Sequence, residues 1–319
     1  MDMEERYINP FTDFGFKRLF GTEMNKELLI SFLNSLLNGH EEITDIQYRN
    51  TEQLGALEQD RKAVFDVYCE NKEGEKFIVE MQKAEQNYFK DRSIYYATFP
   101  IREQAKRGDW DFQLKGVYTV GILNFVFPDD EYASDCMHHE VKLMDVDDKH
   151  IFYDKLTFIY LEMPKFNKTE SELENMMDKW LYVLRNLSRL MERPAALQER
   201  VFKRLFEQAE IARLSPVELR SYEESMKVYR DITNVVNTAE QKGHKRGLAE
   251  GMAQGIEKGM AQGIEKGMAQ GIEKGMAQGI EKGERMMQAE IARQMKDSGM
   301  DAHQISRYTG LTIEEVESL

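Results

Sequence analysis

Apolar residues in the first part of the chain change from helical spacing to strand-like runs. Residues 26–37 (KELLISFLNSLL) carry apolar side chains at helical spacing, and Asn38-Gly39 directly afterwards predicts the end of that helix. Residues 65–68 and 77–82 are apolar runs rich in aromatic and β-branched residues, and the polar connection between them contains Gly74. This pattern predicts a β-hairpin.

Further strands and one helix are predicted on both sides of this hairpin. Residues 43–48 form a first candidate strand, and residues 116–127 (GVYTVGILNFVF) and 155–163 (KLTFIYLEM) form two more. Residues 116–127 are the most apolar of these, so we expect them at the centre of a sheet. A helix is expected from about Ala84, with a break or kink at Pro100, because proline lacks the amide hydrogen that a helix needs. Strands interleaved with helices indicate an α/β fold with a mixed sheet and helical cover.

The region from residue 166 to about residue 242 is predicted to be all-helical and to pack beside the sheet. Three of its segments show helical apolar spacing, at 176–191, 196–214 and 215–241. Ser215 followed by Pro216 predicts the start of the third helix, because serine caps a helix and proline suits its first position.

Residues 243–283 form a repeat. The octad GMAQGIEK occurs four times without change from Gly251 to Lys282, and glycine recurs at every fourth position from Gly243 to Gly283. This spacing would place a stripe of glycine along one side of a helix and permit the close approach of a second backbone. Each glycine also weakens a helix by up to about 1 kcal/mol relative to alanine. The segment is therefore either a self-associating helix or a flexible spacer.

Residues 284–319 are predicted to contain two short helices after the end of a longer one. The longer helix ends at Ser298-Gly299. Residues 301–308 and 313–319 then form a helix–turn–helix pattern, with Thr312 as the cap of the last helix. The segment carries seven acidic residues against four Lys and Arg, which favours a protein contact or a packing role over DNA binding.

These patterns divide the chain into four expected parts: an α/β core (1–165), a helical region (166–242), the glycine repeat (243–283) and a C-terminal helix pair (284–319). The composition is 41% hydrophobic and 31% charged, which is typical of a soluble protein, and no apolar run is long enough to span a membrane. The N-terminal residues lack the basic-then-apolar layout of a signal peptide. The two cysteines have no metal-binding spacing, so a reducing, cytoplasmic location is expected.

Acidic and amide side chains gather at the predicted hairpin. Glu80 and Gln82 lie two positions apart in one strand, which places them on one face, and an antiparallel partner brings Asp66 beside them. Two carboxylates and an amide oxygen form the hard, oxygen-rich set that suits Mg²⁺ or Mn²⁺. Acidic residues on a strand usually form a solvated face. Glu80, however, interrupts the apolar run Phe77-Ile78-Val79, where a buried carboxylate without a partner is costly.

The segment after the hairpin is basic, although the protein as a whole is acidic. Residues 83–107 contain six Lys and Arg against three Asp and Glu, in a chain with a formal net charge of −14. The aromatic residues of this segment include Tyr88, Phe89, Tyr95, Tyr96 and Phe99. Cations beside a carboxylate cluster suit a phosphodiester site, with the cations on the backbone and the carboxylates on a metal. The same aromatic residues also fit an ordinary helix that packs into the core.

Five sequence blocks occur in the order expected for a known family. They are Asn9-Pro10 with DFGFKRLFG (13–21), FIVEMQ (77–82), RSIYY (92–96), LEMPKF (161–166) and DKWL (178–181). In these blocks the chain resembles the PD-(D/E)XK nuclease family transposases, the recombination-promoting nucleases of bacteria. The resemblance covers most of residues 8–250, and a glycine-every-four tail with a terminal helix pair is also common in that group.

The resemblance implies a restriction-endonuclease-like core and metal-dependent cleavage of DNA. By motif position, Asp66 and Glu80 would bind the metal, and the backbone carbonyl of Met81 would be a further ligand. Asp13, on the opening helix, would be a supporting acid. These residues are therefore the expected catalytic and metal-binding set.

Gln82 falls where the wider superfamily usually has lysine, although this family commonly carries glutamine there. Lysine can polarise the attacking water and stabilise negative charge, whereas glutamine only forms neutral hydrogen bonds. Gln82 would therefore position water. Lys83 or Arg92 would supply the missing positive charge and contact phosphates.

The sequence as a whole predicts a Mg²⁺-dependent DNA endonuclease linked to recombination or transposition, with Mn²⁺ as a second usable ion. A homo-oligomer formed through the glycine-rich helix is expected, because two nicks on opposite strands are most simply made by two active sites. Two alternatives are open on the sequence alone. One is a DNA-binding or recombination-associated protein that does not cleave, and the other is an interaction protein that works through residues 243–319.

Overall fold

The computed structural model describes residues 5–37, 42–53, 63–105, 110–127 and 136–319, and divides into two compact units, Met1–Thr238 and Ala239–Leu319. Within the described residues the helices are α1 (Asp13–Phe20), α2 (Lys26–Leu36), α3 (Phe89–Glu103), α4 (Met176–Asn186), α5 (Arg200–Ala209), α6 (Pro216–Asp297), α7 (Ala302–Thr309) and α8 (Ile313–Ser318). The strands are β1 (Ile46–Tyr48), β2 (Glu52–Gln53), β3 (Ala63–Val64), β4 (Val67–Asn71), β5 (Lys76–Gln82), β6 (Val117–Leu123), β7 (His138–Met144) and β8 (Ile151–Glu162).

In the described part of the first unit, one mixed sheet contains six strands in the order β1-β4-β5-β6-β8-β7. β4 and β5 form the predicted antiparallel hairpin, with Val67 opposite Val79. β5, β6 and β8 run parallel, so their carboxyl ends at Gln82, Leu123 and Glu162 lie in one row. β6 lies inside the sheet and is buried along its whole length, as its apolar sequence predicts.

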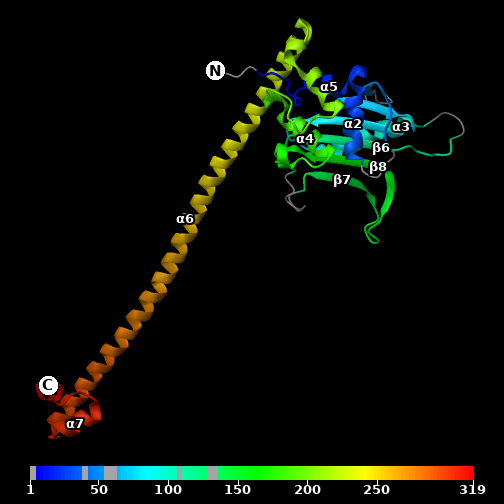
Figure 1. Cartoon of the computed structure of the whole chain (residues 1–319). Helices are drawn as coiled ribbons and strands as arrows, with labels where there is room; N and C mark the ends of the chain where they lie inside the picture. The colour runs from blue at the N-terminus through cyan, green and yellow to red at the C-terminus, as the bar shows by residue number, and fades with distance from the viewer. Residues whose placement is uncertain (1–4, 38–41, 54–62, 106–109, 128–135) are drawn as a thin grey trace. The chain divides into compact units, whose positions relative to one another are not determined.

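Helices cover both faces of this sheet (Figure 1). One face packs against α1, α2, α4, α5 and the first turns of α6, and Trp180 of α4 is fully buried there. The other face packs against α3 through Phe89 and Phe99. The helical region after residue 166 therefore shares its hydrophobic core with the sheet, whose burial supplies the main favourable free energy of folding.

The helix after the hairpin differs from its prediction. α3 begins at Phe89 rather than near Ala84, because Tyr88 has a left-handed backbone with φ of 62° that cannot continue a helix. α3 also runs through Pro100 to Glu103. Proline costs a helix one hydrogen bond and a clash with the carbonyl four residues earlier, and the burial of Pro100 offsets part of that cost. Asn38-Gly39, predicted to end α2, lies outside the described residues.

β7 is a strand that the apolar pattern does not predict. Its sequence HHEVKLM has no fully buried residue, and its conformation depends on antiparallel pairing with β8 at the edge of the sheet. β8 in turn begins at Ile151, four residues before its predicted start. The exposed half of this hairpin lacks the apolar run by which a buried strand is recognised.

α6 contains all four copies of the octad in one helix of 82 residues. The hydroxyl of Ser215 accepts a hydrogen bond from the Glu218 amide at 3.3 Å, which is the predicted cap at the start of α6. α7 and α8 follow, with Thr312 as the cap of α8, and Ile305 and Val316 pack against the end of α6. No described helix combines the length and the apolar character that a membrane crossing needs.

Candidate active site

The hairpin places Asp66 and Glu80 side by side. Asp66 directly precedes β4, and the register of Val67 with Val79 puts Asp66 opposite Glu80. The Asp66 carboxylate accepts a hydrogen bond from the Met81 amide, at 2.8 Å between Oδ2 and N. A residue in a strand directs its amide and its carbonyl to the same edge, so the Met81 carbonyl also faces the Asp66 side.

Glu80 is a buried carboxylate whose hydrogen bonding is incomplete. It is 8% exposed, and Gln82 on the same face donates from Nε2 to Glu80 Oε2 at 3.0 Å. Glu80 Oε1 is buried and has no hydrogen-bond partner among the described residues. Removal from water and the charge of Asp66 raise the pKa of Glu80 to about 8, although Arg92 and Gln82 lower it. A cation at this position would remove the cost of ionising Glu80.

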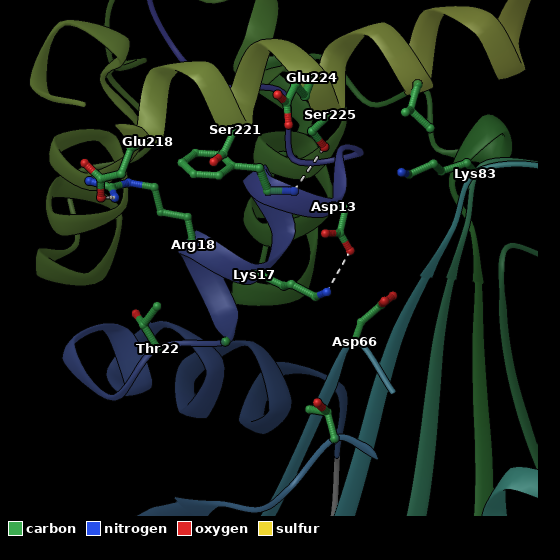
Figure 2. A pocket seen from close by; sticks show the side chains of 14 residues that line it. Asp13, Lys17, Arg18, Thr22, Asp66, Lys83, Glu218, Ser221, Glu224 and Ser225 are labelled. Atoms are coloured by element: carbon green, nitrogen blue, oxygen red, sulfur yellow. Dashed lines mark hydrogen bonds and ion pairs between the residues drawn. The ribbon is translucent and has the colours of Figure 1, made fainter. Parts of the chain in front are cut away.

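Asp66 also lines an open cavity of about 780 Å³ that lies between α1, the end of the hairpin and α6. Figure 2 shows the side chains of Asp13, Asp66 and Lys83 around this space. Burial raises the pKa of Asp66 and so does the charge of Asp13, whereas the Met81 amide and the charges of Lys17 and Lys83 lower it. Asp13 is itself paired with Lys17 at 3.0 Å on the exposed side of α1.

Arg92 approaches Glu80 from α3, on the opposite face of the sheet from α1. Arg92 and Tyr96 line a small enclosed space together with Glu80. The guanidinium lies over the rings of Phe89 and Tyr96, at 5.7 and 5.6 Å from their centroids, and donates a hydrogen bond to Gln86. Arg92 is therefore the cation directed at Glu80, and Lys83 is a cation that acts on Asp66.

The donor set at the hairpin fits a hard divalent ion. Asp66 and Glu80 offer carboxylate oxygens with raised pKa values, Met81 offers a carbonyl, and one buried oxygen of Glu80 lacks a partner in the described chain. Asp13 lies across the cavity rather than in a tight triple with these two acids. Asp13 would therefore support such an ion from a distance through its negative charge, which the ion pair with Lys17 partly offsets.

A different group of residues has its possible metal-binding atoms closer together than the three acids Asp13, Asp66 and Glu80 do. Asp145, Asp148 and His150 form a group of possible metal ligands. Their ligand atoms all lie within 4.8 Å of one another, which holds for no other such group in the part of the chain that the structure describes. Asp145 Oδ1 accepts the amides of Asp147 and Asp148, each at 3.0 Å, which is the usual role of aspartate in a turn. Asp148 and His150 are exposed and Asp145 is half-buried in the connection between β7 and β8, so the proximity of the three follows from the turn.

The comparison with protein families agrees with the fold. The family model for the PD-(D/E)XK nuclease family transposases matches residues 10–239. The chain belongs to this family. The match includes every residue of the candidate site and ends within α6, and the mixed sheet is the restriction-endonuclease-like core that the family implies. No curated protein and no solved structure matches the chain.

Three features of the site in this family member are absent from the sequence-based prediction. Lys17 acts on Asp66, and its only signal in the sequence is its position four residues after Asp13 on a helix. Tyr96 lies close enough to Glu80 for the carboxylate to raise its pKa, although burial is the larger cause. α6 forms one wall of the cavity, and its Ser225 hydroxyl accepts the Phe14 amide at 3.1 Å. No local pattern signals that last contact.

Proposed function

We propose that this protein is a Mg²⁺-dependent DNA endonuclease that acts in recombination or transposition, with Mn²⁺ as a substitute ion. The observation that carries this proposal is the buried Glu80 Oε1, without a hydrogen-bond partner in the described residues, beside the Asp66 carboxylate. Two adjacent carboxylates repel each other when both are ionised, and a cation between them removes that cost. Membership of a nuclease family supports phosphodiester hydrolysis as the chemistry.

Each residue at the end of the hairpin has a separate role in this proposal. Asp66, Glu80 and the Met81 carbonyl hold the ion. When bound, the ion supplies positive charge for the phosphoryl transition state and acidifies a water. Gln82 donates one amide hydrogen to Glu80, which leaves its amide oxygen to accept a hydrogen bond from the attacking water. Asp13 adds negative charge that would attract the ion toward Asp66, and it is itself paired with Lys17.

Lys83 and Arg92 are the proposed phosphate contacts. Lys83 borders the open cavity, which has room for a DNA backbone, and Arg92 lies behind Glu80 on α3. These two cations replace the charge that lysine would supply at position 82. Arg92→Ala should weaken both DNA binding and cleavage. An Arg92→Ala variant that binds and cleaves as wild type does would remove Arg92 from this role.

Cleavage of supercoiled plasmid tests the proposed activity. Purified protein should produce nicked or linear DNA with Mg²⁺ or Mn²⁺ and none with EDTA. Asp66→Asn and Glu80→Gln should abolish the product because each removes a metal-binding charge. Asp148→Asn, in the exposed turn, is the matched control and should cleave normally. Wild-type protein that binds the plasmid in a gel shift without cutting it would favour the non-cleaving alternative.

We also propose that the protein self-associates through α6. A methyl group added at any glycine from Gly243 to Gly283 would meet nothing within 4 Å, so the stripe is open to a second backbone. The residues that follow these glycines in the octads, methionine and isoleucine in alternation, are exposed along the same helix. Burial of these methionine and isoleucine side chains against a second copy of the chain would stabilise the association.

Analytical ultracentrifugation of the full chain tests this second proposal. Wild type should sediment as a dimer or larger species at micromolar concentration. Gly255→Leu, Gly263→Leu and Gly271→Leu together should give the monomer, since leucine blocks close approach and still favours a helix. A matched triple change on another side of the helix, Gln254→Leu, Gln262→Leu and Gln270→Leu, should leave association intact. A monomeric wild type would contradict the proposal.

A further inference from the structure

A second open space lies at the start of α3, next to the candidate site. Its volume is about 450 Å³, and it is lined by residues 85–91 together with Phe125 and Phe127. Phe89 lines this space and also lines the small space around Glu80. Phe89 therefore borders both the opening at the start of α3 and the space that holds Glu80, a proposed metal ligand.

Tyr88 borders this space and combines an exposed side chain with a left-handed backbone, as Phe112 also does elsewhere in the chain. Tyr88 is 80% exposed, the largest value for a Phe, Tyr or Trp among the described residues. Its φ of 62° lies in the left-handed region, which bulky residues rarely occupy. Glycine would suit that backbone better, so the fold keeps a large flat ring in water at a strained position. Strained residues of this kind gather where ligands are held.

The lining of the space has the groups that recognise a nucleobase. Phe125 and Phe127 offer flat apolar surfaces. The Asn87 amide and the amino group of Gln86, whose oxygen accepts from Arg92, offer hydrogen-bonding groups for a base edge. The Lys90 ammonium lies 5.3 Å from the Phe127 ring centroid, which places a cation beside these aromatic side chains. Aromatic stacking with a neighbouring cation is how proteins hold unpaired bases.

We propose that this space receives the base of an unpaired nucleotide, stacked on Tyr88, while an adjoining phosphate lies at Asp66 and Glu80. The inference rests on the proposed nuclease function and names its substrate class: DNA in which base pairing is interrupted at the cleavage site. A base inside an intact duplex is stacked on its neighbours and reaches such a space only after unstacking, at a cost in free energy. Bulged, mismatched or single-stranded DNA avoids most of this cost.

Binding of short DNA without cleavage tests the inference. Three fluorescent oligonucleotides are compared in EDTA and with Ca²⁺: a fully paired duplex, the same duplex with one unpaired 2-aminopurine, and one with an abasic residue at that position. Wild type should bind the unpaired base about tenfold more tightly than the abasic site, and 2-aminopurine emission should fall as the base stacks. Tyr88→Ala should lose both effects, and Tyr88→Trp should keep them.

Two further variants separate loss of the ring from loss of the fold. Tyr88→Gly removes the ring and suits the left-handed backbone, so it should fold as well as wild type and still lose the preference. Phe112→Ala is the matched control, because Phe112 is 78% exposed and has φ of 60°. It precedes the amino end of β6, whereas Gln82 pairs with the carboxyl end of that strand. The variant should keep the preference.

The outcomes distinguish this inference from the proposed function. Equal affinity of wild type for all three oligonucleotides, with plasmid still cleaved, would overturn the inference and leave the nuclease standing. A loss of preference in Phe112→Ala as large as in Tyr88→Ala would also overturn it, because the effect would not belong to the space at α3. No affinity for any DNA, and no cleavage, would overturn both.

Discussion

Single residues at the hairpin are arranged at a cost to stability. Burial and the neighbouring Asp66 hold the pKa of Glu80 near 8, and one of its oxygens has no partner in the described part of the chain. Tyr88 adds a strained backbone a few residues later. Such local costs in stability are expected where a carboxylate binds a cation or an aromatic ring stacks on a base.

Glu80→Gln should stabilise the metal-free protein at alkaline pH. The pKa of Glu80 is higher in the folded protein than in the unfolded chain. The contribution of protonated Glu80 to the free energy of unfolding is therefore fully present below about pH 4.5 and is lost as the pH rises toward 8. The variant avoids that loss, so its free energy of unfolding should exceed that of wild type by up to about 4 kcal/mol at pH 8. Urea unfolding in EDTA at pH 8 and pH 4.5 measures this difference, which should vanish at the lower pH.

Mg²⁺ should raise the melting temperature of wild type, and more at pH 8 than at pH 6. Protons compete with the ion for Glu80, whose pKa is about 8 without metal. Differential scanning fluorimetry with and without Mg²⁺ measures the shift. Asp66→Asn should remove it, whereas Asp148→Asn should keep it. A shift that survives in Asp66→Asn would place the ion elsewhere.

At the scale of elements, α6 combines a helical conformation with a poor helical sequence. Its repeat carries glycine at every fourth position, yet the structure continues α6 to Asp297. Isoleucine and methionine stay exposed along it, so the apolar side chains of the repeat bury little surface within one chain. Any partner that covers these side chains therefore increases the stability of the helix.

Gly263→Ala should stabilise α6 in the monomeric protein by about 1 kcal/mol. Alanine loses less backbone entropy than glycine, and the added methyl group would meet nothing within 4 Å. Thermal loss of circular dichroism at 222 nm, measured at dilutions where the chain is monomeric, reports the change. A decrease in stability would mean that another part of the molecule covers the glycine stripe.

At the scale of the whole molecule, the candidate site belongs to the first compact unit. Its residues run from Asp13 to Val228 in the chain, and the unit ends at Thr238. The start of α6 is anchored within this unit, since the Tyr222 hydroxyl accepts the Asn9 amide at 3.0 Å. The repeat and the helix pair that follows belong to the second unit and contribute no residue to the site.

A chain that ends at Thr238 should keep metal-dependent plasmid cleavage and lose self-association. Its rate of single-strand nicking should stay within a few-fold of wild type, because all proposed catalytic groups remain. Linear product should decline relative to nicked product if two copies act together. Complete loss of DNA cleavage and DNA binding in a folded truncated chain would favour the interaction protein that works through its tail.

Much of the fold and part of the site were predictable from local patterns. The hairpin, the buried β6 and the caps at Ser215 and Thr312 follow from alternation, apolar runs and capping residues, which act over a few positions. The edge strand β7 was not predictable, because its pairing with β8 defines it. The start of α3 was also missed, since the left-handed Tyr88 has no signature in composition.

The sequence by itself determined the chemistry available at the hairpin: two acids, an amide and the nearby cations of residues 83–107. Only the tertiary structure decided how they meet. It buried Glu80 without a second partner in the described chain and divided the cations between the two faces of the sheet. It also made α6 a wall of the cavity, through contacts between residues about two hundred positions apart. Long-range packing sets burial and electrostatic environment, and no local pattern records it.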